Sequence, residues 1–222
     1  MRKKTTKRVY SETNQLQNNL TAKTENQKKY IRAIVENDII FCIGPSGSGK
    51  SFVAAGIACE YLHKKKIDQI IISRPLICTG KDIGSLPGEL KEKINPYLSP
   101  MQNNLKHFLG NRYYGLYINE NKILFETLEL MRGATFNNAI MILDEAQNCT
   151  LEQIKMFVTR IGENSKVIIN GDINQTDLKN KSGLDLCINK VCDVEGVEVT
   201  EMSNIDIQRH SIIAKFLQAI ET

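Results

Sequence analysis

The sequence predicts an α/β fold, with a mostly parallel sheet covered by helices on both faces. Two observations support this class. Short apolar runs alternate along the chain with amphipathic stretches, which is the pattern of buried parallel strands joined by helices. The chain also has 222 residues, of which 41% are hydrophobic, and this is enough for the core of one ordinary α/β domain. Global disorder is therefore excluded.

The elements follow from these runs in chain order. Strands are expected where the runs are short and bounded by polar residues, at 39–43, 69–72, 123–125, 140–143 and 167–169. Helices are expected over the amphipathic stretches 25–36, 50–63, 88–108, 151–161 and 206–220. A break is expected in the third helix at Asn95-Pro96, because proline has no N–H to donate. Residues 75–87, with two glycines and a final proline, are expected to form an irregular loop.

Several predicted strands end in chemically reactive or charged residues. The first is followed by a glycine-rich segment from Gly44, and the others by Ser73-Arg74, Asp144-Glu145 and Gly171-Asp172. In open α/β sheets, ligands bind outside the carboxyl ends of the strands. We therefore expect these four clusters to meet at one edge of the sheet.

The charge is concentrated at the N-terminus. The whole chain has a formal net charge of +4, but from Val9 onward 24 cationic residues face 25 acidic ones. We interpret residues 1–23 as a flexible basic and polar arm and residues 24–222 as the folded domain. Any site for a polyanion on the domain must then be a local patch.

Neither a membrane span nor a disulfide framework is expected. No apolar run approaches the ~18 residues of a membrane helix. The basic start lacks the apolar middle of a secretory signal, so a cytoplasmic protein is expected. The six cysteines form no C-x-x-C pair and most lie among apolar residues, which favours free thiols in the core.

The glycine-rich segment matches the phosphate-binding pattern G-x-x-x-x-G-K-[ST] between a predicted strand and a predicted helix. In this pattern backbone N–H groups and the helix N-terminus surround phosphates, the lysine neutralises the β- and γ-phosphates, and the final hydroxyl binds Mg²⁺. The alternative is a simple glycine turn, which the context disfavours. The pattern predicts bound phosphates and Mg²⁺, and the predicted binding residues are Gly44, Pro45, Ser46, Gly47, Ser48, Gly49, Lys50 and Ser51.

Two adjacent carboxylates follow the buried strand at 140–143. Asp144 is suited to hold Mg²⁺ with Ser51, and Glu145 to take a proton from the attacking water. The alternative is that the pair caps the next helix, where acids are favoured. Beyond the strand at 167–169, Gln175 is a candidate to sense the γ-phosphate or orient water, and a plain turn is the alternative there.

Several segments together resemble one family. The phosphate-binding loop and Ser73-Arg74-Pro75 are followed by more specific segments, in this order: residues 84–98 (GSLPGELKEKINPYL), 131–138 (MRGATFNN), 143–148 (LDEAQN), 157–162 (FVTRIG), 171–175 (GDINQ) and Arg209-His210. They closely resemble the PhoH-like ATPases, and the resemblance covers residues 24–220. It implies a RecA-like P-loop domain similar to the first lobe of superfamily 1 helicases.

The resemblance also implies residue roles. Gln27 resembles the residue that reads adenine, although Thr24 and Gln27 also fit a helix capping box. Arg74 and Arg132 resemble nucleic-acid contacts, and each could instead be an ion-pair partner. Because one lobe leaves the nucleotide exposed on one side, a neighbouring subunit is expected to supply an arginine finger. Arg209 is the preferred finger, and Arg160 is the alternative unless it packs within its own subunit.

These features predict an enzyme that hydrolyses ATP with Mg²⁺ and acts on single-stranded nucleic acid. The resemblance favours RNA over DNA and a homo-oligomer such as a hexameric ring. The alternative is an ATP-driven switch or scaffold that binds a protein partner without moving along nucleic acid. A small-molecule kinase is disfavoured, because the second carboxylate, Glu145, suits hydrolysis by water.

Overall fold

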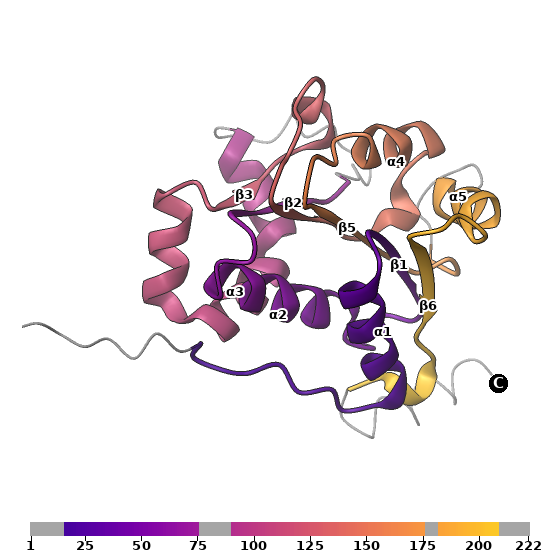
Figure 1. The fold of residues 1–222 in the computed structure, drawn as a ribbon, viewed down its shortest axis with the longest axis horizontal. Helices are drawn as coiled ribbons and strands as arrows, with labels where there is room; N and C mark the ends of the chain where they lie inside the picture. The colour runs from indigo at the N-terminus through magenta and orange to yellow at the C-terminus, as the bar shows by residue number, and fades with distance from the viewer. Residues whose placement is uncertain (1–15, 76–89, 176–181, 209–222) are drawn as a thin grey trace, which may run out of the picture.

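The chain forms a six-stranded sheet in which every strand pair is parallel. The structure is a computed structural model that describes residues 16–75, 90–175 and 182–208 (Figure 1). The strand order is β3-β2-β4-β5-β1-β6. The strands are β1 (Ile39–Ile43), β2 (Gln69–Ser73), β3 (Ile123–Phe125), β4 (Ala139–Leu143), β5 (Lys166–Gly171) and β6 (Val197–Glu201).

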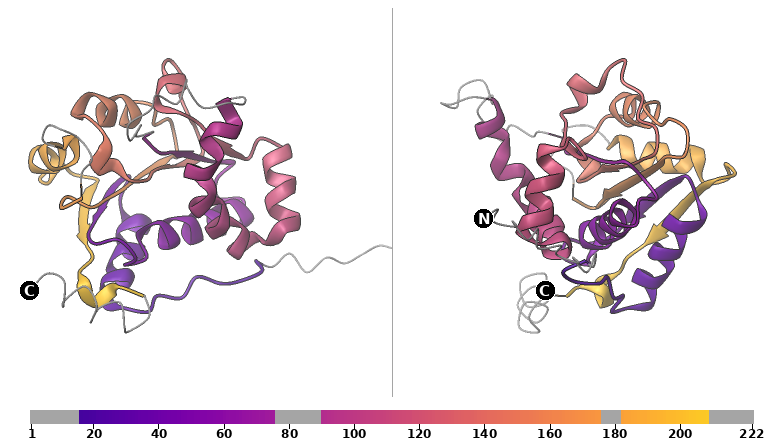
Figure 2. Two further views of the ribbon diagram at one scale, coloured as in Figure 1. Left: turned by 180° about the vertical axis from the view of Figure 1, so that it is seen from behind. Right: turned by 60° about the vertical axis from the view of Figure 1, so that its left-hand side comes forward.

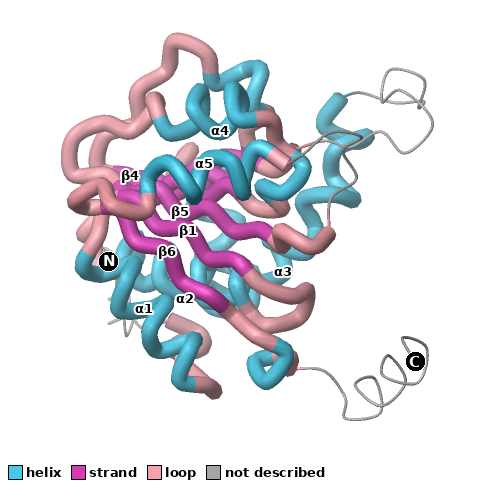
Figure 3. The backbone as a smooth tube through the Cα atoms, turned by 90° about the vertical axis from the view of Figure 1, so that its right-hand side faces the viewer, coloured by secondary structure: helices cyan, strands magenta, loops and turns pink. Residues whose placement is uncertain are grey.

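Helices cover both faces of the sheet, as Figures 2 and 3 show. Successive strand residues point to opposite faces, so Ile40 and Ile168 join one core and Phe41 and Ile169 the other. The first core lies under α1 (Glu25–Glu36), α2 (Lys50–His63) and α3 (Leu90–Asn119). The second lies under α4 (Leu151–Val158), α5 (Gly183–Val191) and two short 3₁₀ helices, η2 (Leu128–Met131) and η3 (Ala146–Asn148). The predicted α/β class is confirmed.

The sheet register places the ends of four strands together. Strand β5 lies between β1 and β4, with Ile43 opposite Gly171 and Leu143 opposite Ile169. Strand β2 lies on the other side of β4, with Ser73 opposite Leu143. The segments that follow these four strands therefore start at one edge of the sheet.

Helix α3 differs from the prediction. The predicted break at Asn95-Pro96 is wrong, because the helix continues past Pro96 and Pro100 as far as a kink at Gly110, beyond which a second helical segment ends at Asn119. Each proline removes one hydrogen bond without ending the helix. The non-helical position is Gly110, with φ 73° and ψ 160°, where a Cβ would lie 2.3 Å from Gln17 Oε1. Glycine has no Cβ and adopts this backbone freely.

Helix α5 and strand β6 were not expected. The β6 sequence alternates apolar and polar residues and lies at the sheet edge, so it contains no continuous apolar run. The predicted helix start at residue 206 is wrong, because Asp206 ends the 3₁₀ helix η4 (Asn204–Asp206) and residues 207 and 208 are not helical. Residues 209–220 lie outside the described part of the chain.

The described part of the predicted N-terminal arm runs along the domain. Leu16 and Leu20 pack against the core under α1, α2 and α3. The Gln17 N–H donates to the Phe108 carbonyl at 2.8 Å. Residues 1–15 lie outside the described residues, so the division at residue 23 stays a prediction. Within the described ranges, no helix is both long and apolar enough to cross a membrane.

Candidate active site

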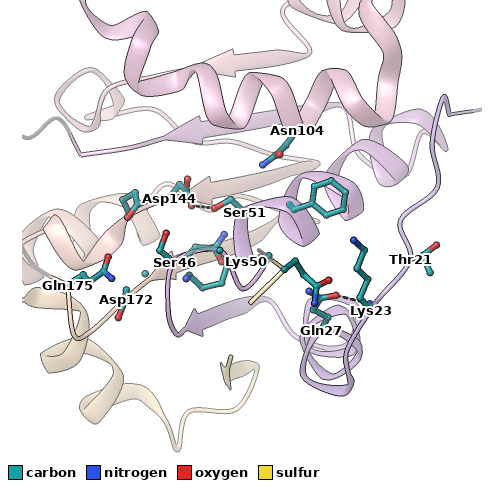
Figure 4. A pocket seen from close by; sticks show the side chains of 17 residues that line it. Thr21, Lys23, Gln27, Ser46, Lys50, Ser51, Asn104, Asp144, Asp172 and Gln175 are labelled. Carbon is teal, nitrogen blue, oxygen red and sulfur yellow. Dashed lines mark hydrogen bonds between the residues drawn. The ribbon is translucent and has the colours of Figure 1, made fainter. Parts of the chain in front are cut away.

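A cavity of about 360 Å³ opens at the carboxyl ends of β1, β4 and β5 (Figure 4). Its wall combines the loop after β1, the start of α2, the two segments after β4 and β5, and one residue of α3. The lining residues are Thr21, Lys23, Gln27, Ser46, Gly47, Gly49, Lys50, Ser51, Phe52, Asn104, Asp144, Glu145, Asn170, Gly171, Asp172, Gln175 and Gln208. The predicted phosphate-binding and carboxylate residues thus meet around one hollow.

The loop between β1 and α2 depends on its glycines. Gly44 has φ 143°, and a Cβ there would lie 2.3 Å from the Met202 carbonyl oxygen. Gly49 has φ 95° and is the N-cap of α2, so the helix N-terminus faces the cavity. Lys50 Nζ donates to the carbonyls of Gly44 at 2.7 Å and Pro45 at 3.0 Å. The loop therefore brings a cation and a helix N-terminus to one point, which suits bound phosphate groups.

Ser51 and Asp144 connect the loop to β4. Ser51 Oγ donates to Asp144 Oδ1 at 2.6 Å. Burial of Asp144, with a smaller effect from the neighbouring Glu145, raises the pKa of the Asp144 carboxyl. The Ser51 hydrogen bond and the positive charges of Arg74 and Lys50 act in the opposite direction. The site thus holds a poorly solvated carboxylate beside a hydroxyl, and a cation bound there would stabilise its charged form.

Glu145 is held from two sides. Its backbone is left-handed, with φ 58° and ψ 40°, and its side chain makes no capping bond to η3, so the helix-capping alternative receives no support. Arg74 Nη2 lies 3.3 Å from Glu145 Oε1, and Arg74 Nη1 donates to the Tyr97 carbonyl at 3.0 Å. Gln147 Nε2 donates to Glu145 Oε2 at 2.6 Å. Both oxygens of the predicted base are therefore engaged.

Gln147 was not among the predicted residues. Its Oε1 accepts from the Asp172 N–H at 3.0 Å, so the buried side chain connects the segment after β4 to the segment after β5. The Asp172 carbonyl accepts from the Gln175 N–H at 3.1 Å, and Gln175 lines the cavity. The sequence did contain one signal for this role, because Gln147 follows Glu145 by two residues in the segment after β4.

Ser51 and Asp144 form a donor set that fits Mg²⁺. A hydroxyl and a carboxylate oxygen lie together at the cavity wall, and Mg²⁺ in nucleotide sites uses one or two protein oxygens with phosphates and water. Among the described residues there is no group of three or more His, Cys, Asp or Glu side chains that could hold a metal by themselves. A Mg²⁺ ion held by Ser51 and Asp144 would take further ligands from phosphates and water.

The family model "PhoH-like protein" matches residues 19–221. The chain belongs to the PhoH-like protein family. A PhoH-like protein from Synechocystis is 42% identical over 202 residues, and one from Bacillus subtilis is 40% identical over 204 residues. These alignments cover 90% and 91% of this chain but 62% and 64% of the relatives, so the chain spans less than two thirds of their length.

The solved structures agree on the fold of this PhoH-like chain. The large terminase from a thermophilic bacteriophage, also solved in complex with ADP, matches with a TM-score of 0.57 at 13% identity. The match covers 88% of this chain and 49% of the terminase. The chain thus shares the fold of that part of the terminase, a parallel sheet with helices on both faces, as the sequence predicted.

Gln27 lies between α1 and the phosphate-binding loop of this PhoH-like domain. Thr24 Oγ1 caps α1 by accepting from the Gln27 N–H at 3.2 Å. The Gln27 side chain does not return this bond to Thr24; its Oε1 accepts from the Lys23 N–H at 2.8 Å and its Nε2 donates to the Ser48 carbonyl at 3.1 Å. The capping box is therefore open, and the amide lines the cavity (Figure 4).

The other arginines of the family resemblance have different surroundings. Arg132 is exposed after η2. Arg160 packs within its own subunit, because its guanidinium donates to the carbonyls of Met156 and Ala134 and to Thr159 Oγ1. Arg209 lies outside the described residues. The structure thus shows Arg160 in the second of its two predicted roles, packing within its own subunit.

Proposed function

We propose that this chain hydrolyses ATP with Mg²⁺ and couples hydrolysis to binding or remodelling of single-stranded nucleic acid, with RNA favoured over DNA. The observation that carries the ATPase proposal is the 2.6 Å contact between Ser51 and Asp144, with Lys50 and Glu145 lining the same cavity. These are the four functions that phosphoryl transfer to water requires: a phosphate clamp, two metal ligands and a base. The terminase that shares this fold was also solved in complex with ADP, which supports a nucleotide as the ligand.

Each residue has a defined part in the proposed reaction. Lys50 leaves the loop carbonyls and binds the β- and γ-phosphates, as its flexible stem permits. Ser51 and Asp144 hold Mg²⁺, which neutralises charge on those phosphates. Glu145 takes the proton of the attacking water, and Gln175 orients that water or contacts the γ-phosphate. Gln27 faces the adenine, and its place in the cavity wall supports this role.

Nucleic acid is proposed to contact Arg74 and Arg132. Arg74 follows β2 at the same sheet edge as the cavity and is partly exposed, so a strand bound there would lie beside Glu145. Arg132 is exposed, so its side chain is accessible to a phosphate. The preference for RNA rests on the family resemblance.

A homo-oligomer, such as a hexameric ring, completes the proposed site. The cavity is open to solvent, and an arginine that neutralises transition-state charge greatly accelerates phosphoryl transfer. We expect Arg209 of a neighbouring subunit to supply it, since the Arg160 guanidinium is engaged within its own subunit. Mixing Glu145→Gln and Arg209→Ala proteins, each inactive alone, should then restore partial ATPase activity. No recovery, with full activity of Arg209→Ala alone, would exclude this finger.

The second candidate is an ATP-driven switch that binds a protein partner. The engaged state of Glu145 favours it, because a base held by Arg74 and Gln147 suits slow hydrolysis. The deciding experiment is steady-state ATPase with and without single-stranded RNA or DNA over a range of salt concentrations. The nucleic-acid proposal predicts stimulation that weakens as salt increases, because phosphate contacts release counterions. ATPase that single strands leave unchanged at every salt concentration would favour the switch.

A further inference from the structure

The ion pair between Arg74 and Glu145 connects two parts of the proposed site. It follows from the register, because Arg74 comes one residue after Ser73 and Glu145 two residues after Leu143, which lie opposite each other on β2 and β4. The Asp144 N–H donates to the Ser73 carbonyl at 2.9 Å and extends this pairing beyond the strands. The contact is thus built into the sheet edge.

The two contacts of Glu145 differ in how easily they can exchange. Gln147 is 3% exposed and is fixed by its bond to the Asp172 N–H, so its contact with Oε2 can persist during a reaction. The Arg74 and Glu145 side chains are 24% and 39% exposed, and their contact with Oε1 is open to competing ions. Partly exposed ion pairs contribute little stability, so a stronger anionic ligand can displace this one.

Arg74 is suited to that competition. Its guanidinium is planar and can bind a phosphate with two parallel hydrogen bonds. One nitrogen is supported by the Tyr97 carbonyl, which orients the group at the sheet edge. When Nη2 turns to a phosphate, Glu145 Oε1 loses its ionic partner and becomes available to water, while Gln147 keeps Oε2 in place.

We propose that Arg74 is a positioning residue that restrains Glu145 until a phosphodiester of a bound single strand takes over its guanidinium. The proposal rests on the proposed ATPase function and explains how nucleic acid would control it. The same arginine then serves as a phosphate contact and as the restraint on the base. Binding of the strand thus releases Glu145 from Arg74 and makes it available as a proton acceptor beside the γ-phosphate.

The test measures ATPase kcat and KM with and without an oligouridylate strand, for wild type, Arg74→Ala and Arg74→Lys. Arg74→Ala should raise kcat without the strand by about three- to fivefold, the rate equivalent of a partly exposed ion pair, with an unchanged KM for ATP. It should also lose stimulation by the strand. Arg74→Lys keeps a charge beside Glu145, so its kcat should lie between the two. The matched control is Arg32→Ala, which removes an arginine–glutamate pair from α1 and should behave as wild type.

A lower kcat in Arg74→Ala, or wild-type stimulation of that variant by oligouridylate, would overturn the restraint. If Arg74→Ala has a higher kcat but oligouridylate does not stimulate the wild type, a phosphodiester is not what releases Glu145. Failure of the proposed function itself is distinct, because the wild type would then hydrolyse no ATP with or without the strand. Thermal unfolding of each variant identifies any loss of kcat that comes from misfolding.

Discussion

Two buried aspartates near the phosphate-binding loop differ in what surrounds their carboxylates. Asp144, at the end of β4, is 5% exposed, and burial beside Glu145 raises its pKa. Asp206, at the end of η4, is fully buried, and burial alone would raise its pKa too. Hydrogen bonds from Asn26 at 2.8 Å and from the Ser203 N–H at 2.7 Å outweigh burial and lower it.

The difference separates the region around Asp206, which stabilises the fold, from the region around Asp144, which is proposed to carry the chemistry. Asp206 ties α1 to the chain after β6, and two residues later the Gln208 N–H donates to the Gly47 carbonyl and supports the loop. Asp144 instead has a charge that the protein alone does not fully compensate. The proposed binding of Mg²⁺ and phosphates would compensate this charge.

The largest expected effect comes from removing the cation on the chemical side. Lys50→Ala should lower ATP turnover by about 10²- to 10³-fold and weaken ATP binding, because the β- and γ-phosphates lose their neutralising charge. Steady-state ATPase and equilibrium nucleotide binding measure both effects. Lys64→Ala is the control, since Lys64 is exposed and paired with Glu60 at the far end of α2. Near-normal turnover by Lys50→Ala would show that the phosphate-binding loop takes no part in the reaction.

The next effect lies on the stability side. Asp206→Asn should lower the free energy of unfolding by about 2 kcal/mol at pH 7, since the bonds from Asn26 and the Ser203 N–H would then go to a neutral amide oxygen and lose their charge assistance. Because the folded pKa is lowered, the contribution of Asp206 is fully present above the unfolded pKa of about 4 and is lost as the pH falls through the folded pKa. Denaturant unfolding at pH 7 and pH 3 measures the change. A loss of equal size at both pH values would show that the charge of Asp206 is irrelevant.

The smallest effect has the opposite sign. Asp144→Asn should raise the free energy of unfolding by about 1 kcal/mol at pH 7, because the buried charge is removed and the amide oxygen still accepts from Ser51. The wild-type penalty arises as the pH rises through the raised folded pKa, so the gain should vanish as the pH falls toward about 4. Asp193→Asn, on an exposed turn, is the control for both aspartates. If Asp144→Asn is instead less stable than wild type at pH 7, Asp144 stabilises the fold as Asp206 does, and the contrast between the two aspartates is wrong.

Local patterns explain what the sequence could predict. The phosphate-binding loop and the pair Asp144-Glu145 were found because their residues are adjacent and the sheet edge follows from buried strands. The α/β class was predicted from the alternating apolar and amphipathic runs and the family from a series of motifs along the chain, and both are confirmed. Strand β6 was missed because an edge strand is only half buried.

Contacts between distant residues were harder to predict. The sequence left Arg74 either as a nucleic-acid contact or as an ion-pair partner, and the β2–β4 register identifies Glu145 as that partner in this structure. Gln147 was missed because its role depends on Asp172, which is 25 residues away. The surroundings of Asp206 depend on Asn26, 180 residues away, and no local pattern indicates that contact.

The most direct test of the chemical side is single-turnover cleavage of ATP by Glu145→Gln. The substitution keeps the size of the side chain and removes the carboxylate that is proposed to take the proton. The account predicts that the variant binds ATP within about threefold of wild type and cleaves it at least about 10²-fold more slowly. Cleavage at the wild-type rate would contradict it, because the base would then lie elsewhere.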